Sequence, residues 1–322
     1  MAGCIQNSHS PTRNPLSLPK HEKDVRLAIH ISGNIANVVG ESITHDREIS
    51  LPRLGLDART RIARNYDRRA RDFGHHTDDD FPTLDRVLTG HGVLLDVGCG
   101  VGGSLRRFIQ YHGSPSQSFG LDISTGMLRQ AAGNSDLARS VGPVRWVLGD
   151  AEDLPFASGS FDVVISVNAV SHLSSLNQVV NGQCRALRRG GRLGVKFRGD
   201  LTLGRPVEQA MRTALGRHLP TEHLQPILDL YQPSSAEAAR EAALDAGLDN
   251  VDVSTARRDW NADPEEVIER FPSIAGYMLD PLSDEERRRV LTDFRRIVLE
   301  HSGTDGLADF EYSVTLTATR PR

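Results

Sequence analysis

The chain has 322 residues, of which 38% are hydrophobic and 25% are charged, and its formal net charge at pH 7 is −4. This balance is typical of a soluble globular protein, and the lack of an excess of Lys and Arg argues against a nucleic-acid-binding protein. Three widely spaced cysteines do not make a disulfide framework, and no apolar run approaches the roughly 18 residues of a membrane span, so we expect a cytoplasmic protein without a membrane segment.

The first fifty residues are predicted to be a flexible extension, and residues 51–322 are predicted to form the main domain. Residues 1–22 are rich in Ser, Pro, Asn and His and poor in apolar side chains, a composition that favours disorder. Residues 24–48 fit a short amphipathic helix with an irregular period.

The first clear helical period falls in residues 56–73. Four apolar or aromatic side chains of this segment recur at helical spacing and share one face, namely Ile62, Tyr66, Ala70 and Phe73. An acidic turn follows, and residues 84–88 are predicted to form a short helix.

From residue 93 the pattern becomes a regular alternation of strands and helices. The predicted strands are 93–97, 118–123, 144–148, 161–167 and 192–197, and the predicted helices are 104–111, 124–132 and 178–187. Ser124 is a plausible N-cap of the second helix, and Gly190-Gly191 is predicted to end the third. Such alternation predicts βαβ units and a parallel sheet.

The alternation breaks after residue 197. Residues 198–231 contain helical stretches and no strand pattern. The elements predicted beyond them are helices at 236–248, 263–271 and 284–301 and strands at 251–255 and 310–317. We interpret residues 56–80, 198–232 and 259–305 as cap elements, in which Trp260, Phe271, Tyr277 and Met278 are candidates for an apolar lid.

A glycine-rich turn, DVGCGVGG at residues 96–103, joins the buried strand 93–97 to the next helix. Glycines permit a tight turn and the close approach of a ligand to the backbone, and the free N–H groups of the following helix favour an anionic group. Gly98, Gly100 and Gly103 also satisfy the G-x-G-x-x-G pattern of dinucleotide sites, with Asp122 following as an acidic partner. By these features alone, the loop fits NAD as well as another nucleotide-like cofactor.

Acidic residues at three strand ends help to separate these alternatives. Asp96 lies two residues before the first glycine, where a carboxylate is unfavourable beside a pyrophosphate but suits a ligand with an ammonium group and a sulfonium. Asp150 follows the third strand, where a carboxylate fits the amino group of adenine, although a turn-forming role alone explains it well. Asp122 can accept hydrogen bonds from vicinal ribose hydroxyls, which serves either cofactor.

Four segments in succession resemble the motifs of the class I S-adenosylmethionine-dependent methyltransferases. They are residues 96–102, residues 121–124, residues 149–156 with 161–164, and residues 187–191. The resemblance covers roughly residues 60–200 and is similar in kind to the small-molecule methyltransferases of ubiquinone and menaquinone biosynthesis. It implies an α/β fold with a doubly wound, seven-stranded, mostly parallel sheet, an antiparallel last strand and helical cap insertions.

The resemblance also implies S-adenosyl-L-methionine as the cofactor, with its methionine part against the glycine loop. Gly98, Gly100 and Gly102 would line that part of the cofactor. Asp96 would lie beneath the loop, and Asn168 would offer a carbonyl oxygen to the ammonium group.

The ribose and adenine contacts are implied in the same way. Asp122 would hold the ribose, and Ile123 would pack on the adenine ring. Asp150 and the backbone of Ala151 would contact the adenine amino group, and Met127 belongs to the same cofactor-binding set. Tyr66 resembles the N-terminal tyrosine that closes over the cofactor in such enzymes, and a core tyrosine is an equally good interpretation.

His172 is the candidate catalytic residue. Methyl transfer from a sulfonium is an in-line displacement, so the protein mainly aligns the acceptor and excludes water. A base is needed only where the acceptor holds its proton near neutral pH. His172 follows strand 161–167 at the cofactor edge and can act as that base or shape the pocket. We expect no metal, because the adjacent His75 and His76 lie in a polar turn and adjacent histidines rarely bind one ion.

The sequence thus predicts methyl transfer to O, N or C of a small, apolar or aromatic metabolite of the natural-product or quinone type. The alternative is an S-adenosylmethionine-binding enzyme that catalyses a cyclisation or rearrangement, followed by an NAD-dependent dehydrogenase and a catalytically silent binding protein. The expected partner is a small molecule rather than a nucleic acid or membrane, and a homodimer is left open.

Overall fold

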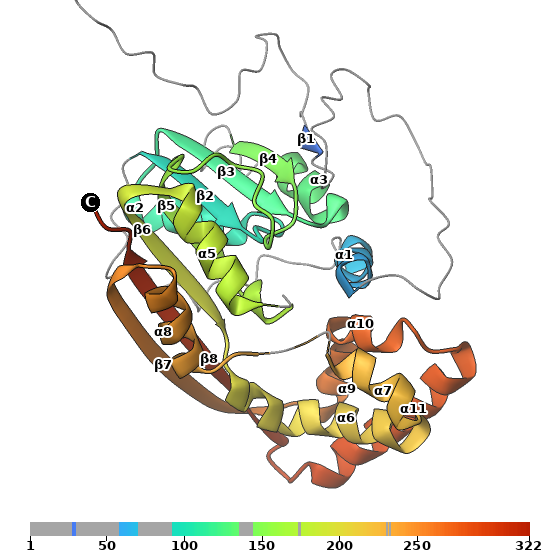
Figure 1. The fold of residues 1–322 in the computed structure, drawn as a ribbon. Coiled ribbons are helices and arrows are strands. Elements are labelled where there is room, and N and C mark those ends of the chain that lie inside the picture. Colours follow the sequence, from blue (N-terminus) through green and yellow to red (C-terminus); the bar gives the residue numbers. More distant parts are fainter. Residues whose placement is uncertain are drawn as a thin grey trace, which may run out of the picture.

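The computed structural model describes residues 28–29, 58–69, 92–134, 144–172, 175–229, 231 and 233–322. Within these ranges, a mixed sheet carries helices on both faces, and a group of helices lies to one side of it (Figure 1). In the same ranges, no helix is both long and apolar enough to span a membrane.

The sheet of the described residues has the predicted topology. Its strands are β1 (Ala28–Ile29), β2 (Val93–Val97), β3 (Gln117–Asp122), β4 (Val144–Leu148), β5 (Phe161–Val167), β6 (Leu187–Arg198), β7 (Asp249–Ala262) and β8 (Leu307–Thr319). Their spatial order is β1-β4-β3-β2-β5-β6-β8-β7. All pairs from β1 to β6 are parallel, and β8 is antiparallel to both β6 and β7. This confirms the mostly parallel sheet with an antiparallel last strand, to which the two-residue β1 adds an edge.

Two pairs of helices cover the sheet. The helices of the described residues are α1 (Ala58–Arg69), α2 (Gly103–His112), α3 (Thr125–Gly133), α5 (Leu176–Ala186), α6 (Pro206–His218), α7 (Thr221–Leu228), α8 (Ala236–Asp245), α9 (Pro264–Ile274), α10 (Gly276–Leu279) and α11 (Asp284–His301), with 3-10 turns η2 (Val170–His172) and η3 (Asp200–Gly204). Side chains of α2 and α3 pack on one face of the sheet, and those of α5 and α8 pack on the other.

The parallel strands bring four chain segments to one edge of the sheet. β5 is buried along its whole length, as its continuous apolar run predicts for a strand covered on both faces. β2, β3, β5 and β6 are parallel neighbours, so their carboxyl ends share the same edge. In an open α/β sheet this is the edge where ligands bind.

The helices beyond β6 have a hydrophobic core of their own. Buried side chains of α6, α7, α9, α10 and α11 contact one another, among them Met211, Phe271, Met278 and Phe294. We call this group of helices the cap. Figure 1 shows it beside the sheet, with α1 between the two, and α1 contacts both α3 and α10.

Three local predictions need correction. Ala28 and Ile29 pair with β4 as a strand, inside the segment predicted as an amphipathic helix. α5 ends at Ala186 with Leu187 as its extended C-cap, so Gly190 and Gly191 do not end the helix. That pair lies within β6, where its backbone groups bond to Arg320 at 2.8 Å.

The third correction concerns β7, which runs to Ala262 rather than ending at Thr255. Its outer half carries charged, exposed side chains and gives no apolar alternation, but its backbone pairs with β8 along its length. The predicted helix at 84–88, the end of the helix predicted at 56–73 and the segment 1–22 lie outside the described residues. The division at residue 50 stays a prediction.

Candidate functional site

The glycine loop after β2 is fixed to the neighbouring strand. The amides of Gly98 and Cys99 both donate to the carbonyl oxygen of Leu121, at 2.7 and 3.0 Å. Gly98 has φ 72° and Gly100 has φ 52°, a region that favours glycine. At Gly98 a Cβ atom would also overlap the Cβ of Ala169, so only glycine fits between β2 and the segment after β5.

Asp122 ties this loop to the start of α3. Its Oδ2 accepts from the amide of Gly100 and its Oδ1 accepts from the amide of Ser124, both at 2.8 Å. Burial raises the pKa of Asp122 to about 6, although the hydrogen bonds from Ser124 and Gly100 favour the charged form. Each oxygen retains a further lone pair, so the carboxylate can still accept from two vicinal hydroxyl groups.

Asp96 is a buried acid and the second-last residue of β2. Its side chain is fully buried, and neither oxygen makes a hydrogen bond of ordinary geometry to the described residues. Burial, followed by the charge of Asp122, raises the pKa of Asp96 to about 8, and the backbone amide of Leu105 opposes this shift. A buried carboxyl group without hydrogen-bond partners is costly in its charged form, and the ammonium group of a ligand would stabilise that form.

The end of β4 approaches the same edge. The amide of Gly149 donates to the carbonyl oxygen of Asp122 at 3.0 Å, which joins the ends of β3 and β4. Asp150 Oδ1 accepts from the amide of Glu152 at 2.9 Å, so this carboxylate also has the turn-forming role. Ala151 is buried in the core of the sheet, and Ile123 is half-buried beside Asp122.

Tyr66 of α1 contacts the glycine loop. Its ring packs with Val101 of the loop and Met127 of α3, a small cluster that links three elements. Met127 is buried, and its amide donates to Oγ of Ser124 at 3.1 Å, which confirms Ser124 as the N-cap. Gly102, with φ 86°, precedes the first turn of α2.

Asn168 and His172 follow β5 at the same edge. The amide of Asn168 donates to the carbonyl oxygen of Lys196 at 2.7 Å, and the residue adopts a left-handed φ of 59°. His172 ends the 3-10 turn η2, and its Nε2 lies 2.9 Å from the hydroxyl oxygen of Tyr66. The structure thus brings the predicted base and the predicted N-terminal tyrosine into direct contact.

Two further tyrosines surround His172. The rings of Tyr231 and Tyr277 both lie 5.3 Å from the imidazole, centroid to centroid, and the ring of Tyr66 lies at 5.6 Å. Burial, then the charge of Glu208, raises the pKa of Tyr277 well above its ordinary value. Tyr277 therefore keeps its phenolic proton near neutral pH.

The other lid candidates divide between two places. Phe271 and Met278 are buried in the cap core, where Phe271 stacks on Phe294 at 5.7 Å between centroids. Trp260 lies on β7, faced by the guanidinium of Arg205 at 5.7 Å. Of the four candidates, only Tyr277 has its ring against His172.

Sequence reasoning missed Tyr231, Glu208 and Asp67 as residues of this region. Glu208 is buried and paired with Arg212 at 2.9 Å. Asp67 directly follows Tyr66, and that adjacency is the one signal that could have singled it out. Tyr231 belongs to an insertion without a recognisable motif, so its position depends on how the cap folds.

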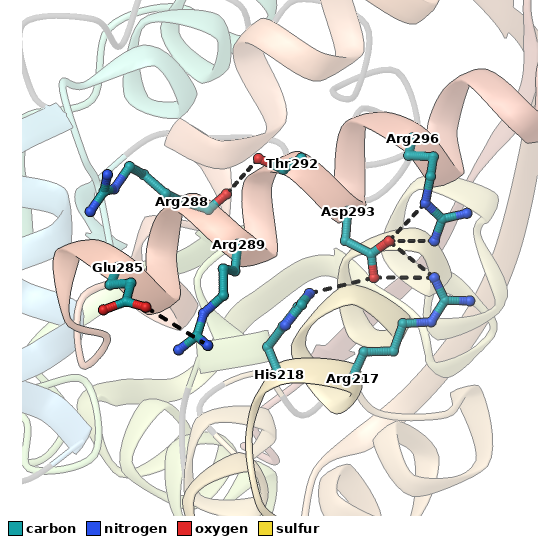
Figure 2. A pocket seen from close by; sticks show the side chains of 8 residues that line it. All are labelled: Arg217, His218, Glu285, Arg288, Arg289, Thr292, Asp293 and Arg296. Carbon is teal, nitrogen blue, oxygen red and sulfur yellow. Dashed lines mark hydrogen bonds and ion pairs between the residues drawn. The ribbon is translucent and has the colours of Figure 1, made fainter.

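A groove of about 640 Å³ lies elsewhere, between α6 and α11 (Figure 2). Its lining residues are Arg217, His218, Glu285, Arg288, Arg289, Thr292, Asp293 and Arg296. Asp293 accepts from Arg217 at 3.1 Å, also pairs with Arg296, and lies 3.6 Å from Nε2 of His218. The groove contains none of the predicted site residues, and its cations and carboxylates largely satisfy one another. We interpret it as a solvated ion-pair network.

Within the described ranges, no group of three or more His, Cys, Asp or Glu side chains is arranged to hold a metal ion. The segment around His75 and His76 lies outside these ranges. The candidate site is therefore built from the glycine loop, Asp96, Asp122 and the aromatic cluster around His172.

Parts of the chain are similar in sequence to known proteins. Residues 95–195 match the family described as a methyltransferase domain. The chain is 32% identical over 183 residues to the biotin biosynthesis bifunctional protein BioHC of Teredinibacter turnerae, covering 50% of this chain and 32% of that protein. It is 38% identical over 113 residues to nocamycin O-methyltransferase of Saccharothrix syringae, covering 35% and 40%.

A third relative is the ubiquinone/menaquinone biosynthesis C-methyltransferase UbiE of Cereibacter sphaeroides, 33% identical over 102 residues, covering 32% of this chain and 40% of that protein. The chain thus spans about a third to two fifths of the length of these relatives. These relatives include both an O-methyltransferase and a C-methyltransferase.

Solved structures share the fold. The phosphoethanolamine N-methyltransferase 2 of Haemonchus contortus, in complex with S-adenosyl-L-methionine, has a TM-score of 0.51 and 20% identity, covering 84% of this chain and 62% of that chain. The YcgJ protein of Bacillus subtilis has a TM-score of 0.50 and 19% identity, covering 74% and 96%. Residues 95–195 thus match a methyltransferase domain, and the sheet has the fold of these solved structures, so the chain is similar to the class I S-adenosylmethionine-dependent methyltransferases.

Proposed function

We propose that this chain transfers the methyl group of S-adenosylmethionine to a small apolar or aromatic metabolite. The observation that carries the proposal is Asp96, a fully buried carboxyl group at the end of β2 whose two oxygens find no hydrogen-bond partner among the described residues. The ammonium group of an amino-acid-bearing cofactor fits this site, whereas the pyrophosphate of NAD would add a second negative charge. Asp122 lies on the next strand, two residues beyond the register partner of Asp96, and its carboxylate supports a ribose contact.

The acceptor is proposed to lie on the His172 side of the loop. When bound, the cofactor supplies an electrophilic methyl carbon attached to a sulfonium. The acceptor atom forms a bond to that carbon as the sulfur–carbon bond breaks, and S-adenosylhomocysteine leaves. For an O–H, N–H or acidic C–H acceptor, His172 is proposed to take the proton, and the contact of its Nε2 with the Tyr66 hydroxyl would orient the ring.

The apolar or aromatic character of the acceptor rests on the surroundings of His172. Tyr66, Tyr231 and Tyr277 present aromatic rings around the imidazole. Aromatic walls favour a flat or apolar ligand and leave their hydroxyl groups to orient it. The cap supplies Tyr277, so cap residues are proposed to select the acceptor.

Two measurements test the proposal in sequence. Titration with S-adenosylhomocysteine and, separately, with NADH is expected to give binding for the first ligand only. Incubation with S-adenosylmethionine and a panel of phenolic and quinol-like acceptors is expected to give a product heavier by one CH₂ group. A product of unchanged mass and altered retention would instead indicate a rearrangement, and preferential binding of NADH would reject the cofactor assignment.

A further inference from the structure

α1 contacts both α3, which lies beside the glycine loop, and α10 of the cap. Residues 65–68 make such contacts on both sides. Asp67 Oδ1 accepts from Oγ of Ser124 and from the amide of Gly126, both at 2.7 Å. The fit there is close, because a Cβ at Gly126 would lie 2.9 Å from the carbonyl oxygen of Asp67 and 3.0 Å from its Cα. The carboxylate thus fixes α1 on the first turn of α3.

The opposite contacts of α1 are with α10. Asn65 is buried, and a Cβ at Gly276 would overlap its side-chain oxygen, so the two backbones lie close together. Arg68 forms an ion pair with Asp280, directly after α10. α1 is therefore held from both sides, with Tyr66 between the two sets of contacts.

Tyr66 connects this helix to the proposed acceptor side. Its hydroxyl lies 2.9 Å from Nε2 of His172, and its ring packs on Val101 and Met127. Asp67 is the next residue along the chain, and its partner Ser124 also donates its amide to Asp122. A short series of contacts thus runs from the proposed ribose-binding carboxylate through Ser124 and Asp67 to the Tyr66–His172 pair.

We propose that Asp67 is a positioning residue, which holds α1 so that the Tyr66 hydroxyl reaches Nε2 of His172. Asp67 bonds to α3 through a single oxygen that accepts from two donors. Loss of that oxygen releases the turn of α1 that carries Tyr66, while the direct bonds from Ser124 and Gly100 to Asp122 remain. The consequence for turnover rests on the proposed methyltransferase function, whereas the geometric consequence does not.

Three substitutions of Asp67 separate hydrogen-bond geometry from charge. Asp67→Asn keeps an oxygen acceptor in the same place and removes the negative charge. Asp67→Glu keeps the charge and displaces the carboxylate by one methylene group. Asp67→Ala removes both, and Asp259→Ala serves as a matched control, because Asp259 is an exposed acid on β7 bonded to Arg257.

The primary measurement is the chemical shifts of the His172 imidazole, taken from long-range ¹H–¹⁵N spectra of the ligand-free protein. Among the twelve histidines, His172 is identified by the signals that disappear in a His172→Gln variant. Asp67→Ala and Asp67→Glu are expected to move these signals in the same direction as Tyr66→Phe does. Asp67→Asn and Asp259→Ala are expected to leave them at the wild-type position.

The proposal is overturned if Asp67→Ala and Asp67→Glu leave the His172 signals unchanged, or if Asp67→Asn moves them as far as Asp67→Ala does. A second readout is kcat, which is expected to fall by about 10- to 100-fold in the Ala variant, as for a misplaced catalytic group, with the affinity for S-adenosylhomocysteine within about threefold of wild type. If the wild type transfers no methyl group, the proposed function fails, and the resonances still decide the role of Asp67.

Discussion

Asp122 acts on the buried carboxyl group of Asp96 across the boundary between β2 and β3, and together with burial it raises the pKa of Asp96 to about 8. We therefore expect Asp96 to be largely protonated at pH 7 in the ligand-free protein. An ammonium group brought close to it favours the charged form and lowers that pKa again.

Binding of S-adenosylhomocysteine is consequently expected to release protons near neutral pH, and its affinity is expected to rise between about pH 6 and pH 8. Calorimetry in buffers with different ionisation enthalpies measures this release. Because Asp122 also has a raised pKa, Asp96→Asn is the variant that isolates the Asp96 contribution. Equal proton release by the variant and the wild type would exclude Asp96 as its source.

Removal of the Asp122 side chain is expected to weaken cofactor binding strongly. Asp122→Ala deletes the proposed ribose contacts and frees the amides of Gly100 and Ser124, and a hydrogen bond to a charged group contributes about 1.5–3 kcal/mol. The dissociation constant for S-adenosylhomocysteine should rise at least about tenfold. Thermal unfolding without ligand controls for damage to the loop, and unchanged affinity would reject the ribose assignment.

His172 and Tyr66 are expected to affect turnover more than cofactor binding. His172→Gln removes the proposed base and should lower kcat by about 10²- to 10⁴-fold, the usual contribution of general-base catalysis. Tyr66→Phe removes only the hydroxyl that contacts Nε2, so a smaller loss of kcat is expected. An acceptor that is already deprotonated at the assay pH is the informative control, because its methylation should be insensitive to His172→Gln.

Two glycines of the loop should respond differently to alanine. Gly98→Ala places a Cβ against Ala169, so it is expected to lower both the stability and the affinity for cofactor. Gly100→Ala meets no atom within 4 Å, and its left-handed φ alone costs about 1–2 kcal/mol. Denaturant unfolding of the two variants makes the comparison, and equal destabilisation would mean that the contact with Ala169 relaxes freely.

The ion pairs of Asp293 in the groove of Figure 2 are expected to give a pH-dependent contribution to stability. Burial opposes ionisation of Asp293, but hydrogen bonds from Arg296 and Arg217 outweigh it and lower the pKa of this acid. A lowered pKa means that the stabilisation is complete above the unfolded value of 3.8 and is lost as pH falls through the folded value. Asp293→Asn should therefore cost about 1 kcal/mol or less at pH 7. The difference in the free energy of unfolding between Asp293→Asn and the wild type, measured by denaturant unfolding, should shrink in strong acid and at high salt.

The best predicted elements are those whose signal is local. β4 and β5 match their predicted bounds because each is a short, mostly apolar segment. α11 also begins and ends as predicted, and a capping box between Ser283 and Glu286 marks its start. Such features are determined by neighbouring residues and can be recognised without the tertiary structure.

The elements that were mispredicted depend on distant partners. The outer half of β7 is exposed and polar, and it is a strand because β8 supplies the hydrogen bonds. β1 likewise exists through its pairing with β4. In the candidate site, the loop and its acids follow from motif order, but the approach of Tyr277 to His172 requires the folded cap. The oligomeric state and the cytoplasmic location stay predictions.

The cap packs around its own hydrophobic core, apart from the cores on either face of the sheet. A substitution inside the cap core is therefore expected to loosen the cap helices first and to reach the glycine loop only through α1. Under the proposed function, residues that face the acceptor can therefore change while those that face the methyl donor stay the same. The family match ends at residue 195, before the first cap helix, so it covers the strands around the glycine loop and none of the cap helices.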